Sequence, residues 1–123
     1  MIQNIHYNQL NEAMSCRKSE KNPEPYMAGT MFVGSDRYPI VVVEVVNNKK
    51  IKISPIYYDD YNNHIYEKNG NQYVKEDYMQ KYNDNTTTYT YRKNNRWMPM
   101  GQDMWGTCSI HLGYADSYLD PSF

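Results

Sequence analysis

The sequence predicts a mostly β fold of the α+β class, a small antiparallel sheet or partly closed barrel built of hairpins with one or two short helices. Residues 40–46 are almost wholly β-branched, and residues 86–93 alternate Thr and Tyr. Short apolar runs are separated by clusters rich in Asn and Gly, which favour turns. The 123 residues fit a single domain, with a helical segment over 1–25 and a β-rich core over 26–123.

The first expected element is a short helix over residues 8–20. Leu10, Ala13, Met14 and Arg17 have the spacing i, i+3, i+4 and i+7 and would therefore share one face of this helix. Two prolines in residues 22–25 remove backbone donors and end this helix.

The next stretch predicts strands. Residues 30–33 form a short strand, residues 34–39 read as a turn, and residues 40–46 form the central strand. The Asn-rich segment 47–50 returns the chain into a strand over 51–54, so we expect an antiparallel hairpin here.

The middle of the chain, residues 57–85, is polar and rich in Tyr, Asn and Asp, with Gly70 as a turn. Val74, Tyr78 and Tyr82 have the i, i+4, i+8 spacing of a two-turn helix. Because Tyr73 and Val74 also suit the end of a strand, the sequence leaves helix and strand open over residues 73–82.

A second hairpin follows. A strand over 86–93 turns at Asn94-Asn95 into residues 96–100, and residues 107–112 form a last strand before an irregular tail over 113–123. We expect residues 86–123 to carry the binding surface of the protein.

A two-residue turn sets the register of this hairpin so that Arg92 faces Trp97. The core face would then consist of Tyr89, Tyr91, Met98 and Met100. Arg92 and Trp97 would share the opposite face, where a cation and an indole can hold a phosphate and stack on a nucleobase, or simply cover each other on a solvated sheet. A turn longer by one residue would instead point Trp97 into the core.

The charge balance argues against a broad class of partners. The chain has 13 basic and 14 acidic residues, so it lacks the positive field on which general nucleic-acid binders depend. Its longest apolar run is too short to cross a membrane, and the first residues have no secretion signal. We therefore expect a cytoplasmic protein.

Neither the cysteines nor the histidines have the spacing of a metal site, and we expect no metal and no cofactor. Cys16 and Cys108 lie near opposite ends of the chain, which favours two free thiols over a disulfide. His6, His64 and His111 are scattered.

Catalytic machinery is also not visible, so the sequence predicts a binding protein and not an enzyme. Ser109 and His111 share one strand face, but no nucleophile-elbow context surrounds the serine. Asp59 and Asp60 read as a solvated run, and no phosphate-binding glycine loop is present.

A second guanidinium lies in the first half of the chain. The turn Ser35-Asp36-Arg37-Tyr38 offers this guanidinium next to a hydroxyl and a carboxylate, a combination that can clamp a phosphate and a ribose hydroxyl. The competing interpretation is a turn closed by an internal Asp36–Arg37 ion pair.

The order of these motifs resembles the anti-Thoeris sponges of phages and prophages, which sequester the cyclic ADP-ribose isomers made by bacterial TIR-domain enzymes. The resemblance covers residues 28–123 and is carried by Ala28-Gly29-Thr30, Gly34-Ser35-Asp36-Arg37-Tyr38-Pro39, the Val-rich strand, Tyr91-Arg92-Lys93-Asn94-Asn95-Arg96-Trp97, Leu112-Gly113 and Tyr118-Leu119-Asp120-Pro121-Ser122-Phe123. It implies a homo-oligomer, at least a dimer, in the cytoplasm of an infected bacterial host, which binds the nucleotide signal and releases it intact.

The resemblance also implies roles for individual residues. The pyrophosphate would be bound by Arg37, Arg92 and Arg96, and the adenine would stack on Tyr38, Trp97 or Tyr118. Asp36 and Asp120 complete the expected ligand-binding set. One departure is that Tyr114-Ala115 stands where the family has basic residues after the Leu-Gly step, so phosphate contacts there are in doubt.

Two other functions remain open. The chain suits a protein-binding inhibitor of a bacterial defence system, similar to an anti-CRISPR protein, through exposed Tyr and Met. It also suits a small barrel that binds single-stranded nucleic acid through Tyr91, Arg92 and Trp97, against which the missing positive charge counts.

Overall fold

The computed structural model describes residues 20, 22–84, 86–92, 96–100 and 109–119. The predicted helix over 8–20 lies outside the described residues except for Glu20, as do Cys16, Cys108, the turn at Asn94-Asn95, Asp120 and Phe123.

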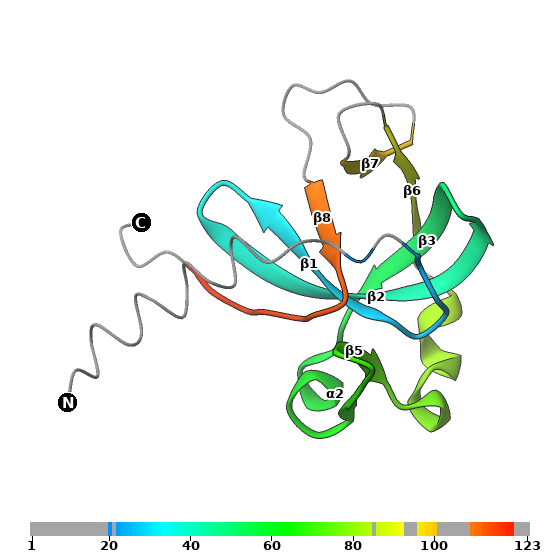
Figure 1. Cartoon of the computed structure of the whole chain (residues 1–123). Coiled ribbons are helices and arrows are strands. Elements are labelled where there is room, and N and C mark those ends of the chain that lie inside the picture. Colours follow the sequence, from blue (N-terminus) through cyan, green and yellow to red (C-terminus); the bar gives the residue numbers. More distant parts are fainter. Residues whose placement is uncertain (1–19, 21, 85, 93–95, 101–108, 120–123) are drawn as a thin grey trace.

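The described chain confirms the mostly β fold, and its barrel is closed. The elements are β1 (Ala28–Val33), β2 (Asp36–Asn47), β3 (Lys50–Pro55), α2 (Tyr58–Asn63), β4 (Ile65–Lys68), β5 (Asn71–Val74), the 3₁₀ helices η1 (Glu76–Tyr78) and η2 (Gln80–Asn83), β6 (Thr87–Tyr91), β7 (Trp97–Pro99) and β8 (Ser109–Leu112). Within this described part, six antiparallel strands close in the order β1-β2-β3-β6-β7-β8, and β4 pairs with β5 as a separate sheet. The segment from α2 to η2, here called the insertion, packs against one end of the barrel (Figure 1).

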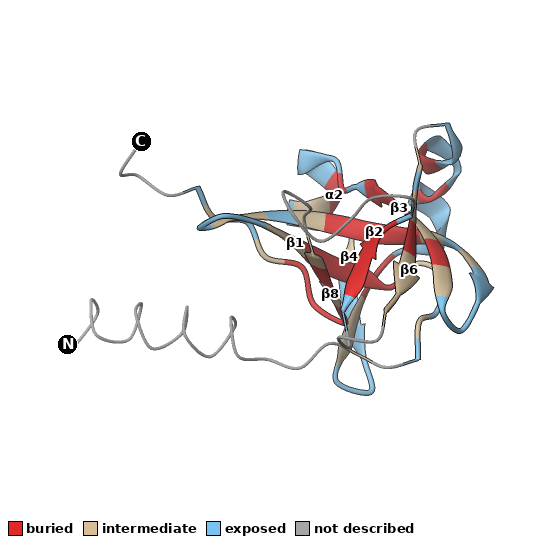
Figure 2. Ribbon diagram, turned by 90° about the horizontal axis from the view of Figure 1, so that it is seen from above, coloured by how far each residue is buried: buried red, intermediate tan, exposed pale blue. Residues whose placement is uncertain are grey.

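Strand β2 is buried on both faces over residues 40–42, which explains why β-branched residues follow one another there. Ile40 and Val42 point into the barrel interior, where they meet Tyr89, Trp97 and other core residues. Val41 points to the outside and packs with the insertion in a second core. Figure 2 shows the middle of β2 in red, where residues 40–42 are buried. The central strand expected at residues 40–46 is therefore confirmed, and it begins four residues earlier at Asp36.

The first predicted hairpin is also confirmed. β2 and β3 pair antiparallel, and because Asn47 pairs with Lys50, only two residues form the turn. The side-chain oxygen of Asn47 accepts a hydrogen bond of 2.8 Å from the amide of Lys49. At the other end of β2 the predicted turn over 34–39 is too long, because Val33 already pairs with Asp36.

The insertion contains a hairpin that the sequence interpretation missed. β4 and β5 are joined by Asn69-Gly70, whose φ angles of 55° and 81° suit the tight turns of two-residue hairpins. Over residues 73–82 the sequence left helix and strand open, and the structure contains both. Strand β5 ends at Val74, and the 3₁₀ helices η1 and η2 follow it.

The predicted register of the second hairpin is wrong by one residue. Tyr91 pairs with Trp97, and the amide of Arg92 donates to the carbonyl of Arg96. The longer turn points Trp97 into the barrel, where it is 1% exposed and its ring lies 5.2 Å from that of Tyr91. Since neighbouring strand residues point to opposite faces, Arg92 lies on the outside of the barrel. Met100, expected in the core, is 54% exposed.

The close approach of β1 to its neighbours yields a stability prediction. A Cβ on Gly29 would lie 2.6 Å from the carbonyl oxygen of His111 and 2.8 Å from Cδ1 of Ile40. We expect Gly29→Ala to lower the free energy of unfolding by about 2 kcal/mol, because a packed core accommodates an added methyl poorly. Urea denaturation followed by tryptophan fluorescence measures the change.

Gly34→Asn is the matched control. Gly34 has a φ of +59° with open space around its Cβ position, and Asn tolerates this conformation. Its effect should stay within about 0.5 kcal/mol. Equal stability of wild type and Gly29→Ala would contradict the close approach.

Candidate functional site

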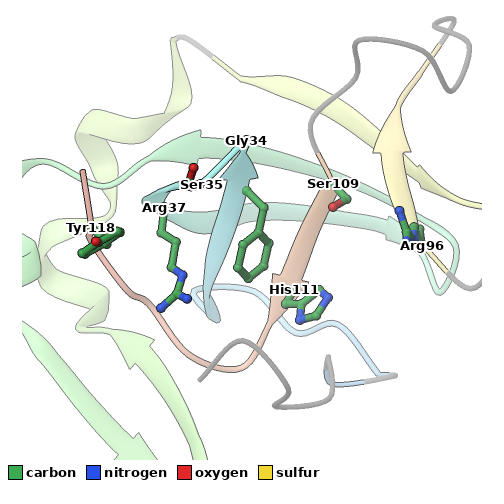
Figure 3. Close-up of a pocket in the computed structure, with 8 residues that line it drawn as sticks. Gly34, Ser35, Arg37, Arg96, Ser109, His111 and Tyr118 are labelled. Atoms are coloured by element: carbon green, nitrogen blue, oxygen red, sulfur yellow. The ribbon is translucent and has the colours of Figure 1, made fainter. Parts of the chain in front are cut away.

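An open hollow of about 510 Å³ lies on the outer face of the barrel. It is lined by Phe32, Gly34, Ser35, Arg37, Arg96, Ser109, His111 and Tyr118. These residues come from β1, the turn after it, the start of β2, the residue before β7, strand β8 and the tail. Figure 3 shows Arg37 and Tyr118 together at one end, with Ser109, His111 and Arg96 toward the other.

Strand pairing explains why these side chains meet. Phe32 pairs with Arg37 on one side and with Ser109 on the other, so all three point to the same face of the sheet. His111 lies two residues after Ser109 and therefore shares that face. The ring of Phe32 contacts the imidazole of His111 edge-on, with centroids 4.9 Å apart. The middle of the hollow is thus aromatic.

At one end of the hollow Arg37 is held by the tail. Its guanidinium forms an ion pair of 2.8 Å with Asp116, and the two side chains are only 12% and 19% exposed. The backbones of Arg37 and Tyr118 exchange two hydrogen bonds of 2.7 and 3.0 Å. The guanidinium carbon also lies 5.7 Å from the centre of the Tyr118 ring. Arg37 therefore has a fixed position in the wall.

A buried threonine ties the tail to the barrel. Thr30 is 0% exposed, and its hydroxyl donates to the carbonyl of Tyr114 at 2.9 Å and accepts from the amide of Asp116 at 3.1 Å. The amide of Gly113 donates to Ala28, and the amide of Ala115 donates to the side chain of Gln72. The tail is irregular, as expected from the sequence, yet its backbone is bonded to both the barrel and the insertion.

The other end of the hollow is formed by Arg96. It directly precedes Trp97, which pairs with Ile110, and this register brings it beside the outer face of Ser109 and His111. The residue is exposed. Across the described ranges, no acidic side chain forms an ion pair with Arg96.

Three of the predicted site residues meet here: Arg37, Arg96 and Tyr118. Arg92 and Trp97 do not join them. Trp97 is buried inside the barrel, and Arg92 donates hydrogen bonds of 3.2 Å each to the hydroxyl of Thr90 and the carbonyl of Pro99. The expected exposed pair of Arg92 and Trp97 is therefore wrong, for the reason that the turn is longer by one residue.

The remaining predicted residues lie elsewhere. Asp36 and Tyr38 alternate with Arg37 along β2 and point to the other face, where the Tyr38 hydroxyl lies 3.4 Å from the Asp36 carboxylate. Asp120 lies outside the described residues. The internal ion pair considered for Asp36 and Arg37 is replaced by the pair of Arg37 with Asp116.

Five residues of the hollow do not belong to the predicted ligand-binding set: Phe32, Gly34, Ser35, Ser109 and His111. The sequence shows that Ser109 and His111 share a strand face, and the pairing of Phe32 with Ser109 adds Phe32 to that face. The missing information was the pairing of β1 with β8, which joins segments about eighty residues apart.

A second polar cluster lies in the insertion around Asp60. Its carboxylate is 0% exposed and contacts the hydroxyl of Tyr82, Nδ1 of His64 and Nζ of Lys81. Asp59, Asp60 and His64 bring ligand atoms within 4.8 Å, a spacing that suits a metal ion. Lys81 already supplies the cation, however, and hydrogen bonds engage both Asp60 oxygens, so this cluster fits a structural role.

The reading of Asp59 and Asp60 as a solvated run is thus wrong for Asp60. Three tyrosine rings surround the partner ammonium of Lys81, with centroids 5.4 to 5.8 Å away, those of Tyr57, Tyr78 and Tyr82. Burial alone raises the pKa of Asp60, but hydrogen bonds from Lys81, Tyr82 and His64 outweigh it and hold the pKa below its ordinary 3.8. Burial and the bond to Asp60 raise the pKa of Tyr82.

This cluster predicts a pH-dependent stability. Because the folded state lowers the pKa of Asp60, the stabilisation is present above the unfolded value near 3.8 and is lost as the pH falls through the lower folded value. We expect Asp60→Asn to cost about 3 kcal/mol at pH 7, since it leaves Lys81 without its buried partner. The difference from wild type should shrink below about pH 4.

Urea denaturation at pH 7 and at pH 3 measures this difference. Asp59→Asn is the control, because Asp59 is exposed on the same helix and should change stability by about 0.5 kcal/mol or less. An Asp60→Asn variant as stable as wild type at pH 7 would exclude the proposed importance of the network.

Within the described ranges, no helix is both long and apolar enough to span a membrane. Comparison with known proteins gives no matching family model and no significant match among curated proteins or solved structures.

Proposed function

We propose that the protein binds an anionic, nucleotide-type small molecule in the hollow and holds it without cleaving it. The observation that carries this proposal is the meeting of two guanidiniums, of Arg37 and Arg96, with aromatic side chains in one hollow of about 510 Å³. Following the sequence resemblance, the specific ligand is a cyclic ADP-ribose isomer, and the protein acts as a phage anti-defence sponge.

The size and chemistry of the hollow support this class of ligand. Small-molecule sites commonly measure about 300 to 1,000 Å³ and combine apolar walls with a few placed polar groups. A guanidinium can bind phosphate oxygens through paired N–H donors, and its planar group can also stack on a ring. Rings such as those of Phe32, His111 and Tyr118 offer faces or edges for a nucleobase.

The near-neutral charge of the chain is compatible with such a ligand. With 13 basic and 14 acidic residues, the protein has no general attraction for a polyanion, whereas one nucleotide needs only local cations. This contrast favours a small anionic molecule over a nucleic acid. Homo-oligomerisation and a location in the cytoplasm of an infected bacterium belong to the proposal through the resemblance.

Calorimetry with cyclic ADP-ribose isomers tests the proposal. Wild type should bind one of them, and heat denaturation of the complex should release the ligand chemically unchanged. Arg96→Ala should weaken binding about tenfold, because a charge-assisted hydrogen bond to phosphate is lost.

Arg92→Ala is the matched control, because it removes an equal charge from a residue outside the hollow. Its affinity should stay within about twofold of wild type, a difference of less than 0.5 kcal/mol. Absence of binding with every isomer would refute the proposal. A larger loss in Arg92→Ala than in Arg96→Ala would show that the ligand binds elsewhere.

A further inference from the structure

We infer that the hollow has two chemically different ends, so that Arg96 binds the phosphate of the ligand and the Arg37–Asp116–Tyr118 end takes its aromatic base. This inference rests on the proposed function and adds the orientation of the ligand. It identifies the minimal ligand as a nucleoside monophosphate unit, with a ring at one end and one phosphate group at the other.

The two cations of the hollow differ in charge balance. Asp116 lies 2.8 Å from the guanidinium of Arg37, and both side chains are mostly buried, so the pair is neutral within the wall. A phosphate that approached Arg37 would also meet the carboxylate, and opposed like charges are costly at an interface. The backbone bonds around Tyr114, Asp116 and Tyr118 hold this carboxylate in place.

Arg96 provides the positive charge that remains. It is exposed and, in the described part of the chain, forms no ion pair with an acidic side chain. The adjacent hydroxyl of Ser109 and imidazole of His111 line the same hollow, and both side chains can donate hydrogen bonds to a phosphate. An oxyanion is therefore best stabilised at this end.

The opposite end suits a ring. The guanidinium of Arg37 is planar, is held in position by Asp116, and lies beside the Tyr118 ring. A fixed guanidinium plane and a phenol ring stack on nucleobases with little loss of side-chain entropy. Phe32 pairs with Arg37 and extends the aromatic surface toward His111.

The distance between the ends fits one nucleotide unit. Arg37 is on β2 and Arg96 precedes β7, and the barrel order places β1 and β8 between them. Three strand spacings amount to about 14 Å along the curved sheet. Figure 3 shows the two arginines on opposite sides of Ser109 and His111. The base, the sugar and the phosphate can therefore occupy successive parts of the hollow.

The orientation is tested with fragments of the ligand on the full chain. The affinities for AMP, adenosine and ribose 5-phosphate are measured by calorimetry. Arg96→Gln should lower the affinity for AMP and for ribose 5-phosphate about tenfold and change the affinity for adenosine by no more than about twofold. The double variant Arg37→Met with Asp116→Asn removes the guanidinium without leaving a lone buried charge. It should weaken AMP and adenosine by equal factors and leave ribose 5-phosphate unchanged.

Lys75→Gln is the control, since it removes one exposed positive charge outside the hollow and should leave all three affinities unchanged. Where fragments bind below the detection limit, the variants are compared with the bound cyclic ADP-ribose isomer at low and high salt. In Arg96→Gln the affinity should then change less between low and high salt than in wild type. In the double variant it should change as much as in wild type.

The results separate two failures. Equal weakening of AMP and adenosine by Arg96→Gln, or a selective loss of ribose 5-phosphate in the double variant, would overturn the orientation while the binding function stands. The orientation would also be overturned if the affinity of the double variant alone became independent of salt. Absence of wild-type binding to every fragment and every isomer would overturn the proposed function and the orientation with it.

Discussion

The structure depends on the burial of both faces of β2. Inward side chains such as Ile40 and Val42 fill the barrel, and Val41, between them, holds the insertion against the outside. Because the side chains of a strand alternate, a single run of β-branched residues supplies two cores at once. The barrel and the insertion therefore cannot be positioned independently, and the start of the same strand presents Arg37 at the wall of the hollow.

The hollow in turn depends on how the tail returns to the barrel. A hydroxyl at the fully buried Thr30 would be costly without partners, and the tail backbone provides them at Tyr114 and Asp116. That anchoring places Asp116 beside the guanidinium of Arg37. Two residues later, Tyr118 pairs with Arg37 at the start of β2. Hydrogen bonds and an ion pair thereby join segments from both ends of the described chain into one surface.

Local sequence patterns predicted most of the fold but less of the site. The hairpin of residues 40–46 and 51–54 was predicted correctly, because its signals, the β-branched residues and the Asn-rich turn, each lie within a few residues. The local signal for the hairpin of β4 and β5 is the Asn69-Gly70 pair, in which both residues adopt a positive φ. One extra residue in the turn before Trp97 reversed the faces predicted for residues 97–100, because strand side chains alternate with a period of two, whereas Tyr89 and Tyr91 kept their predicted core face. The contact between Arg37 and Asp116 joins residues far apart in the chain, which no local pattern encodes.

The position of the hollow on the outside of the barrel has an evolutionary consequence. Trp97 and its neighbours pack in the interior, and the hollow lies outside, so folding and the proposed recognition use alternate residues of the same strands. Phe32, Ser109 and His111 can therefore vary while the residues between them keep the barrel packed. A small chain can therefore acquire a new binding specificity by substitutions at outward positions, while the inward residues keep it folded.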